Sequence, residues 1–507
     1  MMRLPAFLLT GLILLLFPFT ASAQGAGKPK PNVLWIMVDD MSPHFSCYGE
    51  KTIATPHLDR LAAEGTRFSQ AHVTAPVCSP CRSALITGLY QTSIGAHHHR
   101  SGRGTVRLTL PAPVEPVPGL FQRAGYYTCI GNGQDPGSKP NARGKTDYNF
   151  DWDPAMYDGS DWNGRKEGQP FFMQVQLPGG KLRGASPADA RKLAARAARE
   201  LGSSVKPADV TLPPHYPRDP VLLEDWAAYL DAVRLTDQHV GQVIARLEKE
   251  GLLENTLIIF LTDHGISHAR GKQFLYDEGT RVGFILRGPG VPEGAVRNDP
   301  VSANIDAPAL SLAAAGLPVP DWMQGRDLLA KNYQPREAIF AARDRCDETV
   351  DGIRSVRTAR WKYIRNFYPD RPMLQPNAYK DGKAIMQTLR RLHEAKQLSE
   401  RHERLLFAPT RAPEELYDLT ADPWELNNIA ALPDQKSTLL TLRTQLDHWM
   451  AETKDQGRQP ESEATYDSDM NATDPAGGGK PPKAGNGAAT IELMKRWRTE
   501  RPMKVNP

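Results

Sequence analysis

Short apolar runs are the clearest structural signal along this chain. Three of them, at residues 33–38, 169–177 and 257–262, are mostly apolar and lack the strict alternation of a half-exposed strand. A strand that is covered on both faces has this pattern, which is typical of the centre of a parallel sheet. A shorter run at residues 126–130 predicts a further strand, with a helix before it.

Helical spacing of apolar residues occurs between these runs. The apolar positions between residues 224 and 247 fall on one helical face: Trp226, Leu230, Val233, Val240, Ile244 and Leu247. Asp237 lies on the same stripe, where a buried acid needs a polar partner, so we expect it to be structural. The Ala- and Arg-rich residues 185–205 predict an exposed helix. Alternating strands and helices predict an α/β fold, with a large central, mostly parallel sheet flanked by helices.

The composition becomes more polar after Pro320. We expect a catalytic domain at residues 24–330 and a smaller α+β subdomain, built on a short antiparallel sheet, at residues 331–454. Three runs in the smaller unit predict short strands: residues 354–360, 361–366 and 415–419. Residues 455–507 are expected to be a low-complexity tail, in which the Gly-, Pro-, Asp- and Lys-rich residues 455–487 are disordered and a short helix follows near residues 491–497.

The N-terminus predicts export. Residues 1–23 combine Arg3, an apolar run from Leu8 to Phe19 and a terminal Ala-Ser-Ala, which is the pattern of a cleaved signal peptide. The run is too short for a membrane span and no later segment offers one, so we expect a periplasmic or secreted protein with no membrane span. A net charge of +4 over 507 residues does not argue for a nucleic-acid partner, and it permits only a weak preference for anionic substrates.

Polar residues directly follow two of the predicted central strands. Asp39 and Asp40 end the first of them, and Asp263 and His264 end another. The carboxyl ends of parallel strands share one edge of the sheet, where ligands collect. Three carboxylates and an imidazole would make a hard, oxygen-dominated site that suits Ca²⁺ or Mg²⁺ better than zinc. Solvated loop acids are the alternative.

Cys78 is predicted to lie at a positive pole. Ser79 can cap a helix that begins beside Pro80 and ends at Gly88, which places Cys78 just outside the first turn. Unpaired backbone N–H groups and the guanidinium of Arg82 suit a tetrahedral anion there, and a nucleophile that meets it. A buried cysteine before an ordinary helix is the alternative that this segment leaves open.

The same segment resembles the signature of the sulfatase family, in the alkaline phosphatase superfamily. The matching residues are Cys78, Pro80, Arg82, Thr87 and Gly88. A second similar block begins at Asp263-His264, continues through Gly271-Lys272 and ends with the Arg-Gly-Pro-Gly string at residues 287–290. The resemblance implies that a formylglycine-generating maturation enzyme converts Cys78 to formylglycine, whose hydrated aldehyde attacks sulfur.

The resemblance also implies the residues of the site. Ca²⁺, with Mg²⁺ as the less favoured ion, is expected on five ligands: Asp39, Asp40, the modified Cys78, Asp263 and His264. The expected catalytic residues are Cys78, Arg82, Lys145 and Lys272. The metal ion and Arg82 would lower the pKa of one hydroxyl of the hydrated aldehyde and hold it in line with sulfur, while Lys145 and Lys272 would neutralise charge that spreads over the sulfate oxygens.

The chain departs from the family pattern at two positions. Asp147 and Lys181 stand where the family usually has histidines, so the resemblance does not identify the donor of the leaving-group proton. Lys145 keeps the family's Gly-Lys step after Gly144, and large aromatic residues that can fix the chain follow it. Lys139 lies in turn sequence, where holding an ammonium in place costs conformational entropy. We therefore predict Lys145 as the catalytic contact.

The expected substrate is a sulfated carbohydrate. Residues 342–348 resemble the heparan N-sulfatase-like branch of the family. Of the three consecutive histidines, His97 or His99 is expected to line the anion pocket. The candidate substrate contacts are His97, Lys181, Arg343 and Arg345.

We predict an exported sulfatase that hydrolyses sulfate esters or sulfamates. One alternative is a phosphate or phosphonate ester hydrolase of the same superfamily. The other is a non-catalytic secreted glycan-binding protein, because two of the family's usual histidines are replaced.

Overall fold

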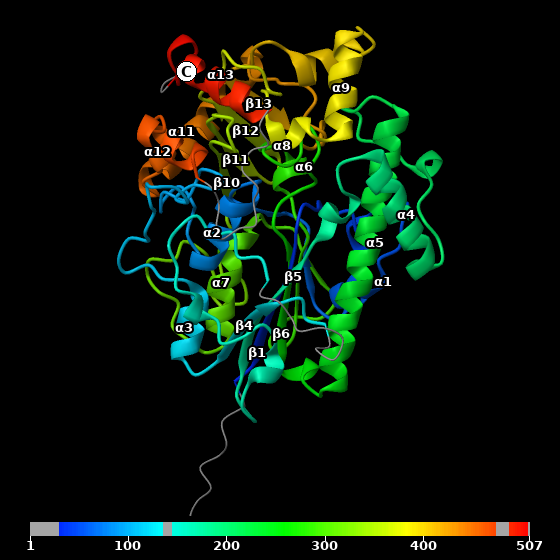
Figure 1. Ribbon diagram of the computed structural model, residues 1–507. Coiled ribbons are helices and arrows are strands. Elements are labelled where there is room, and N and C mark those ends of the chain that lie inside the picture. Colours follow the sequence, from blue (N-terminus) through cyan, green and yellow to red (C-terminus); the bar gives the residue numbers. More distant parts are fainter. Residues whose placement is uncertain (1–29, 135–143, 473–485, 505–507) are drawn as a thin grey trace, which may run out of the picture.

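The apolar runs form neighbouring strands of one seven-stranded sheet (Figure 1). The computed structural model describes residues 30–134, 144–472 and 486–504, so the predicted signal peptide at residues 1–23 and Lys139 lie outside the described residues. The strands of this sheet are β1 (Asn32–Val38), β2 (Thr66–Phe68), β4 (Tyr127–Gly131), β5 (Phe171–Leu177), β6 (Thr256–Thr262), β7 (Phe284–Arg287) and β8 (Ala295–Arg297). Their order is β4-β5-β1-β6-β7-β2-β8, and the four strands from β4 to β6 are parallel.

Helices cover both faces of this sheet (Figure 1). The helices of the larger unit are α1 (Pro56–Ala63), α2 (Cys78–Thr87), α3 (Val117–Arg123), α4 (Pro187–Leu201), α5 (Pro220–Lys249), α6 (Asp277–Thr280) and α7 (Ala303–Ala314). Alternate residues of β1 point to opposite faces: Leu34 and Ile36 join the core under α1 and α5, whereas Trp35 and Met37 join the core under α2, α3 and α7. This double coverage explains the continuous apolar run of β1.

A second, antiparallel sheet lies above the carboxyl edge of the first (Figure 1). It consists of β10 (Ala338–Arg343), β11 (Ile353–Thr358), β12 (Trp361–Asn366) and β13 (Glu414–Asp418) in that order. The helices of this C-terminal part of the chain are α8 (Ala378–Asp381), α9 (Ala384–Glu394), α10 (Glu400–His402), α11 (Lys436–Glu452), α12 (Glu463–Met470) and α13 (Asn486–Glu500). A two-stranded parallel pair, β3 (Ala71–His72) with β9 (Val301–Ser302), completes the strands that the structure describes. The predicted fold class is confirmed.

Two local predictions differ from the structure. The helix α2 begins at Cys78 itself, after the extended Val77, and the Ser79 hydroxyl accepts a hydrogen bond from the backbone of Arg100 instead of capping the helix. The helix ends at Gly88 as predicted, in the left-handed conformation that glycine adopts without strain. In the tail, the described residues 455–472 are ordered and include α12, which contradicts the prediction of disorder there.

Asp237 has the structural role that its position on the α5 stripe predicts. Its carboxylate accepts hydrogen bonds from the backbone N–H groups of His57 and Leu58 at 3.3 and 2.8 Å, at the start of α1. Burial raises the pKa of this carboxyl to about 6. Among the described residues, no helix is both long and apolar enough to cross a membrane.

Candidate active site

Two parallel strands bring three carboxylates to one point. β1 and β6 run side by side with Val38 opposite Thr262, so the residues that follow each strand meet at the carboxyl edge of the sheet. The backbone N–H of Asp40 donates to Asp263 at 3.1 Å. Asp40 has a positive φ of 54°, which turns the chain sharply after β1.

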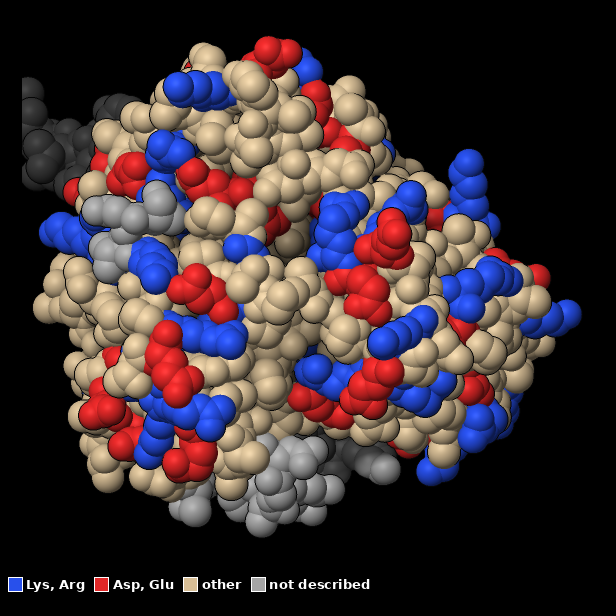
Figure 2. All heavy atoms as spheres, turned by 90° about the horizontal axis from the view of Figure 1, so that it is seen from above, with Lys and Arg blue, Asp and Glu red and all other residues tan. Residues whose placement is uncertain are grey.

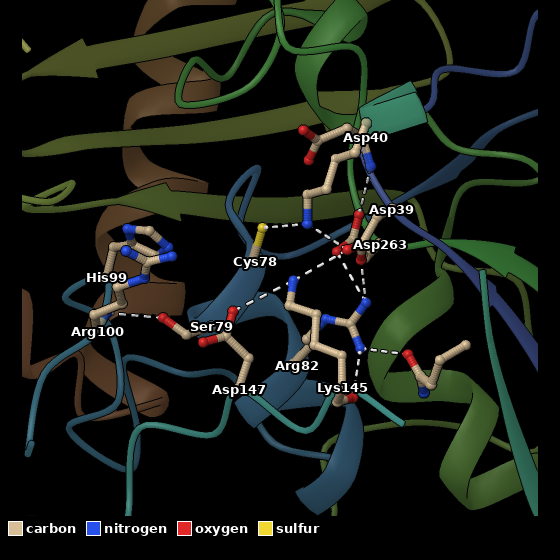
Figure 3. Close-up of polar contacts among 12 residues, drawn as sticks. Asp39, Asp40, Cys78, Ser79, Arg82, His99, Arg100, Lys145, Asp147 and Asp263 are labelled. Atoms are coloured by element: carbon tan, nitrogen blue, oxygen red, sulfur yellow. Dashed lines mark hydrogen bonds and ion pairs between the residues drawn. The ribbon is translucent and has the colours of Figure 1, made fainter. Parts of the chain in front are cut away.

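Cys78 faces this group of carboxylates from the first turn of α2 (Figure 3). Its Sγ lies 3.2 Å from Nε2 of His264 and 3.1 Å from Nζ of Lys272. Burial alone would raise the pKa of the Cys78 thiol, but the surrounding lysine ammonium groups and the imidazole lower it well below its usual value. The side chain is therefore placed where negative charge is stabilised.

Three cations converge on Asp39. Arg82 and Lys181 form direct ion pairs with its carboxylate, and Lys145 Nζ lies 3.2 Å from it. Arg82 also contacts Asp263 at 3.3 Å, so it links the ends of the two strands. Burial acts to raise the pKa of Asp39, but the three positive charges hold it well below the usual range.

Asp40 has a different cationic partner. Lys272 Nζ lies 2.9 Å from its Oδ1, and the hydroxyl of Tyr379 donates to its other oxygen at 3.3 Å. Burial raises the pKa of Asp40, whereas Lys272 and neighbouring charges lower it more strongly. The site thus combines Arg82, Lys181 and Lys272 with the ionised carboxylates of Asp39 and Asp40 in a largely buried volume, where electrostatic interactions are strong.

The predicted metal ligands have the chemistry of a calcium site. Carboxylate oxygens of Asp39, Asp40 and Asp263 converge from two strand ends, and one atom each of Asp40, Cys78 and His264 lie within 4.8 Å of one another. Burial and the negative charge of Asp39 raise the pKa of Asp263 to about 7, so this carboxylate lacks full compensation from the protein's own cations. A divalent cation would supply that compensation, and hard oxygen donors fit Ca²⁺.

The structure brings one of the four predicted substrate contacts close to Cys78. Lys181 Nζ lies 3.9 Å from Sγ. Arg343 is instead paired with Asp351 at 2.5 Å, and the other two residues lie in packed surroundings described below. The guanidinium of Arg343, which the sequence predicts to bind substrate, is therefore already paired with an acid of the protein.

Arg345 and His97 are enclosed by the protein. The guanidinium of Arg345 pairs with Glu461 at 2.8 Å and also with Asp469, so both acids come from the C-terminal segment. His97 packs against His98 in a tilted arrangement with 4.2 Å between ring centroids, and burial lowers the pKa of His97 to about 4. Among the described residues, the side-chain partners of Cys78 are His264, Lys181 and Lys272, and neither Arg345 nor His97 is one of them.

Sequence reasoning missed several residues that the structure places at the site. Gln176, at the carboxyl end of β5, accepts a hydrogen bond of 2.6 Å from Arg82, and Tyr379 contacts Asp40. Of the two histidines that the sequence offered for the anion pocket, His99 and not His97 lies near Cys78, and its partner is Asp347. The position of Gln176 at a strand end was a usable signal, whereas nothing in the local sequence distinguishes the three consecutive histidines.

The surface above the site carries charges of both signs. Figure 2, which views the molecule from above, shows Lys and Arg side chains interspersed with Asp and Glu over this face. Such an arrangement lacks the single-sign stripe of a nucleic-acid-binding surface. An anion is therefore expected to be recognised by the buried cations rather than by a broad basic face.

Comparisons with known proteins agree with this geometry. The family model described as Sulfatase matches residues 31–317. An ulvan-active sulfatase of Formosa agariphila is 33% identical over 475 residues, which cover 86% of this chain and 77% of that protein. Human N-sulphoglucosamine sulphohydrolase is 28% identical over 478 residues, covering 85% of this chain and 92% of that protein. A solved structure of a protein in complex with its substrate D-glucosamine-2-N,6-O-disulfate shares the fold, with a TM-score of 0.58, 19% identity and coverage of 84% of this chain and 98% of that one.

The fold, the site and these matches define a sulfuric ester hydrolase. The chain belongs to the sulfatase family, which confirms the resemblance seen in the sequence. The match to N-sulphoglucosamine sulphohydrolase over most of both chains agrees with the heparan N-sulfatase-like branch.

Proposed function

We propose that this protein is an exported sulfatase that removes sulfate from a sulfated carbohydrate, as a sulfate ester or a sulfamate. The observation that carries this proposal is the group of four cations around Cys78, of which Arg82 and Lys272 are buried and Lys145 and Lys181 are partly exposed. Such a group fits a compact tetrahedral anion, because several fixed charges can share its oxygens without rearranging.

The proposed roles follow from the contacts. Lys145 and Lys181 reach the site from the side of Asp39 and would bind the sulfate oxygens, and Lys272 would hold the nucleophile at position 78 in place. Formylglycine at position 78 would supply an oxygen nucleophile, and Ca²⁺ on Asp39, Asp40, Asp263 and His264 would supply positive charge beside it. Arg82 would keep the two strand ends in register, because it contacts both Asp39 and Asp263.

The substrate class rests on the relatives and on the character of the site. One relative is named for its activity on ulvan and another for N-sulphoglucosamine, and both names describe sulfated sugars. The predicted signal peptide supports export to the periplasm or the medium, where such polysaccharides would be met. Conversion of Cys78 would require a formylglycine-generating maturation enzyme as a partner.

The proposal is tested with protein produced together with that maturation enzyme. A panel of sulfated mono- and oligosaccharides, including O-sulfated and N-sulfated sugars and the matched phosphate esters, is assayed for released sulfate or phosphate. We expect sulfate release from at least one sugar and faster turnover than of the matched phosphate. Cys78→Ala is the control and should release none. Absence of sulfate release from every sugar by protein with confirmed formylglycine would contradict the proposal.

A further inference from the structure

His99 presents an unused ring nitrogen beside Cys78 (Figure 3). A ring nitrogen of His99, Sγ of Cys78 and a carboxylate oxygen of Asp147 lie within 4.8 Å of one another. The His99 side chain is 6% exposed, and its Nε2 has no hydrogen-bond partner among the residues that the structure describes. Buried nitrogens are rarely left unpaired, because they lose water without gaining a partner. The unpaired Nε2 therefore indicates that its hydrogen-bond partner is a group of the bound substrate.

Asp347 holds the other ring nitrogen. Nδ1 of His99 lies 3.0 Å from Oδ1 of Asp347. Burial acts to raise the pKa of Asp347, but the charges of His99 and Arg100 beside it keep this pKa well below the usual range, so the carboxylate is an acceptor. Nδ1 then carries a hydrogen, and Nε2 is the nitrogen that faces the site. Asp347 has a left-handed backbone with φ of 51°, a costly conformation for a non-glycine residue, which persists only where its surroundings fix it.

Backbone contacts fix this pair on both sides. The N–H of His99 donates to the carbonyl of Arg345 at 2.8 Å, and the guanidinium of Arg345 donates to the carbonyl of Asp347 at 2.9 Å. The N–H of Arg100 donates to the hydroxyl of Ser79 at 2.8 Å. The backbone at His99 and Arg100 is thus attached both to the helix that carries Cys78 and to the segment that follows β10.

The two residues that replace the family histidines are poor proton donors. The ammonium of Lys181 forms a direct ion pair with Asp39 and lies 3.9 Å from Sγ of Cys78, so it is held on a carboxylate as a fixed charge. Burial raises the pKa of Asp147, but Lys145 and Arg103 lower it well below the usual range, so Asp147 carries no proton to give. Both residues suit anion binding or structural pairing better than proton transfer.

We infer that His99 donates the proton to the leaving group, with Asp347 as the residue that positions it. This inference rests on the proposed sulfatase function. As the oxygen nucleophile at position 78 bonds to sulfur, the bond from sulfur to the leaving oxygen or nitrogen breaks and its electron pair stays on the leaving atom. The proton on Nε2 of the His99 imidazolium moves to that atom, which leaves a neutral imidazole whose remaining hydrogen stays on Nδ1 toward Asp347. The neutral imidazole regains a proton from the water that completes hydrolysis.

The test compares leaving groups in mature His99→Gln and wild-type protein. Substrates are the sulfate monoesters that the wild type turns over, from sugar sulfates to aryl sulfates such as 4-nitrophenyl sulfate, ranked by the acidity of the released alcohol. We expect kcat/KM for sugar sulfates to fall by about 10²–10⁴-fold, the usual contribution of a general acid. For the most acidic phenols the loss should be about tenfold or less, because a phenolate leaves without a proton.

His98→Gln is the matched control, since His98 is on the same loop and its Nδ1 accepts from the backbone of Arg345. Its effect should not vary with the leaving group. Calorimetric binding of inorganic sulfate should be unchanged in His99→Gln, which separates proton donation from anion binding. Asp347→Asn should show a smaller loss of kcat/KM with the same dependence on the leaving group. It tests the inference if His99→Gln does not fold.

An equal loss for all leaving groups, or no loss, would overturn the inference. A wild type that releases no sulfate from any substrate would instead overturn the proposed function, so the two failures are distinguishable.

Discussion

Arg345 provides a direct test of whether a predicted substrate contact is structural. The sequence predicts that Arg345 binds substrate, but its guanidinium is 1% exposed and pairs with Glu461 and Asp469, whose side chains are 3% and 1% exposed. Arg345→Met keeps most of the side-chain volume and removes the charge. It therefore leaves two buried carboxylates without their cation.

The expected cost is large for a single substitution. Removing one partner of a buried ion pair typically costs about 3–5 kcal/mol, because the remaining charge is stranded. That corresponds to roughly a hundred- to several-thousand-fold in the folding equilibrium. Burial already raises the pKa of Asp469 even with Arg345 present, and loss of the guanidinium would raise it further. The destabilisation should therefore be largest at about pH 8 and smaller at about pH 5, where the stranded carboxylates take up protons.

Urea unfolding and thermal melting at both pH values measure this effect. Arg345→Met combined with Glu461→Gln should be more stable than Arg345→Met alone, because one stranded charge is removed, and the two single variants complete a double-mutant cycle. Arg345→Met protein with wild-type stability and a raised KM for sulfated sugars would refute this reasoning and restore the substrate contact.

Three further outcomes are expected. Lys145→Ala should lower kcat/KM for sulfated sugars by about 10²–10³-fold, the usual effect of losing one preorganised donor, and an unchanged kcat/KM would exclude Lys145 from the sulfate site. Asp39→Asn should abolish both calcium binding, measured by metal analysis, and sulfate release, and activity that survives exhaustive chelation would contradict the calcium site. Burial raises the pKa of Asp237 from 3.8 to about 6, so its ionisation costs stability as the pH rises through about 4 to 6. In urea unfolding, Asp237→Asn should therefore be more stable than the wild type by up to about 3 kcal/mol above pH 6 and equally stable below pH 4. A stability difference that does not change with pH would be inconsistent with this origin.

Local sequence was sufficient for the frame of the site. The continuous apolar runs identify β1, β5 and β6, because strands covered by helices on both faces need apolar side chains on both. Acids that follow such strands must meet at the carboxyl edge, whatever the connecting loops do. Cys78, Arg82 and Gly88 are likewise set by the spacing within one short helix.

Other features were decided only by tertiary packing. The sequence cannot distinguish His99 from His97, because the choice depends on Asp347, 248 positions away, and on Ser79 holding the loop. The local sequence presents Arg345 as an unpaired cation, but in the structure it pairs with Glu461, 116 positions away. Glu461 belongs to the tail, which its composition predicts to be disordered. Short-range spacing fixes which side chains share a helix face or a strand end. The partner of a long charged side chain is fixed by which distant segments pack beside it, because a buried charge must be paired wherever the fold brings a counter-charge.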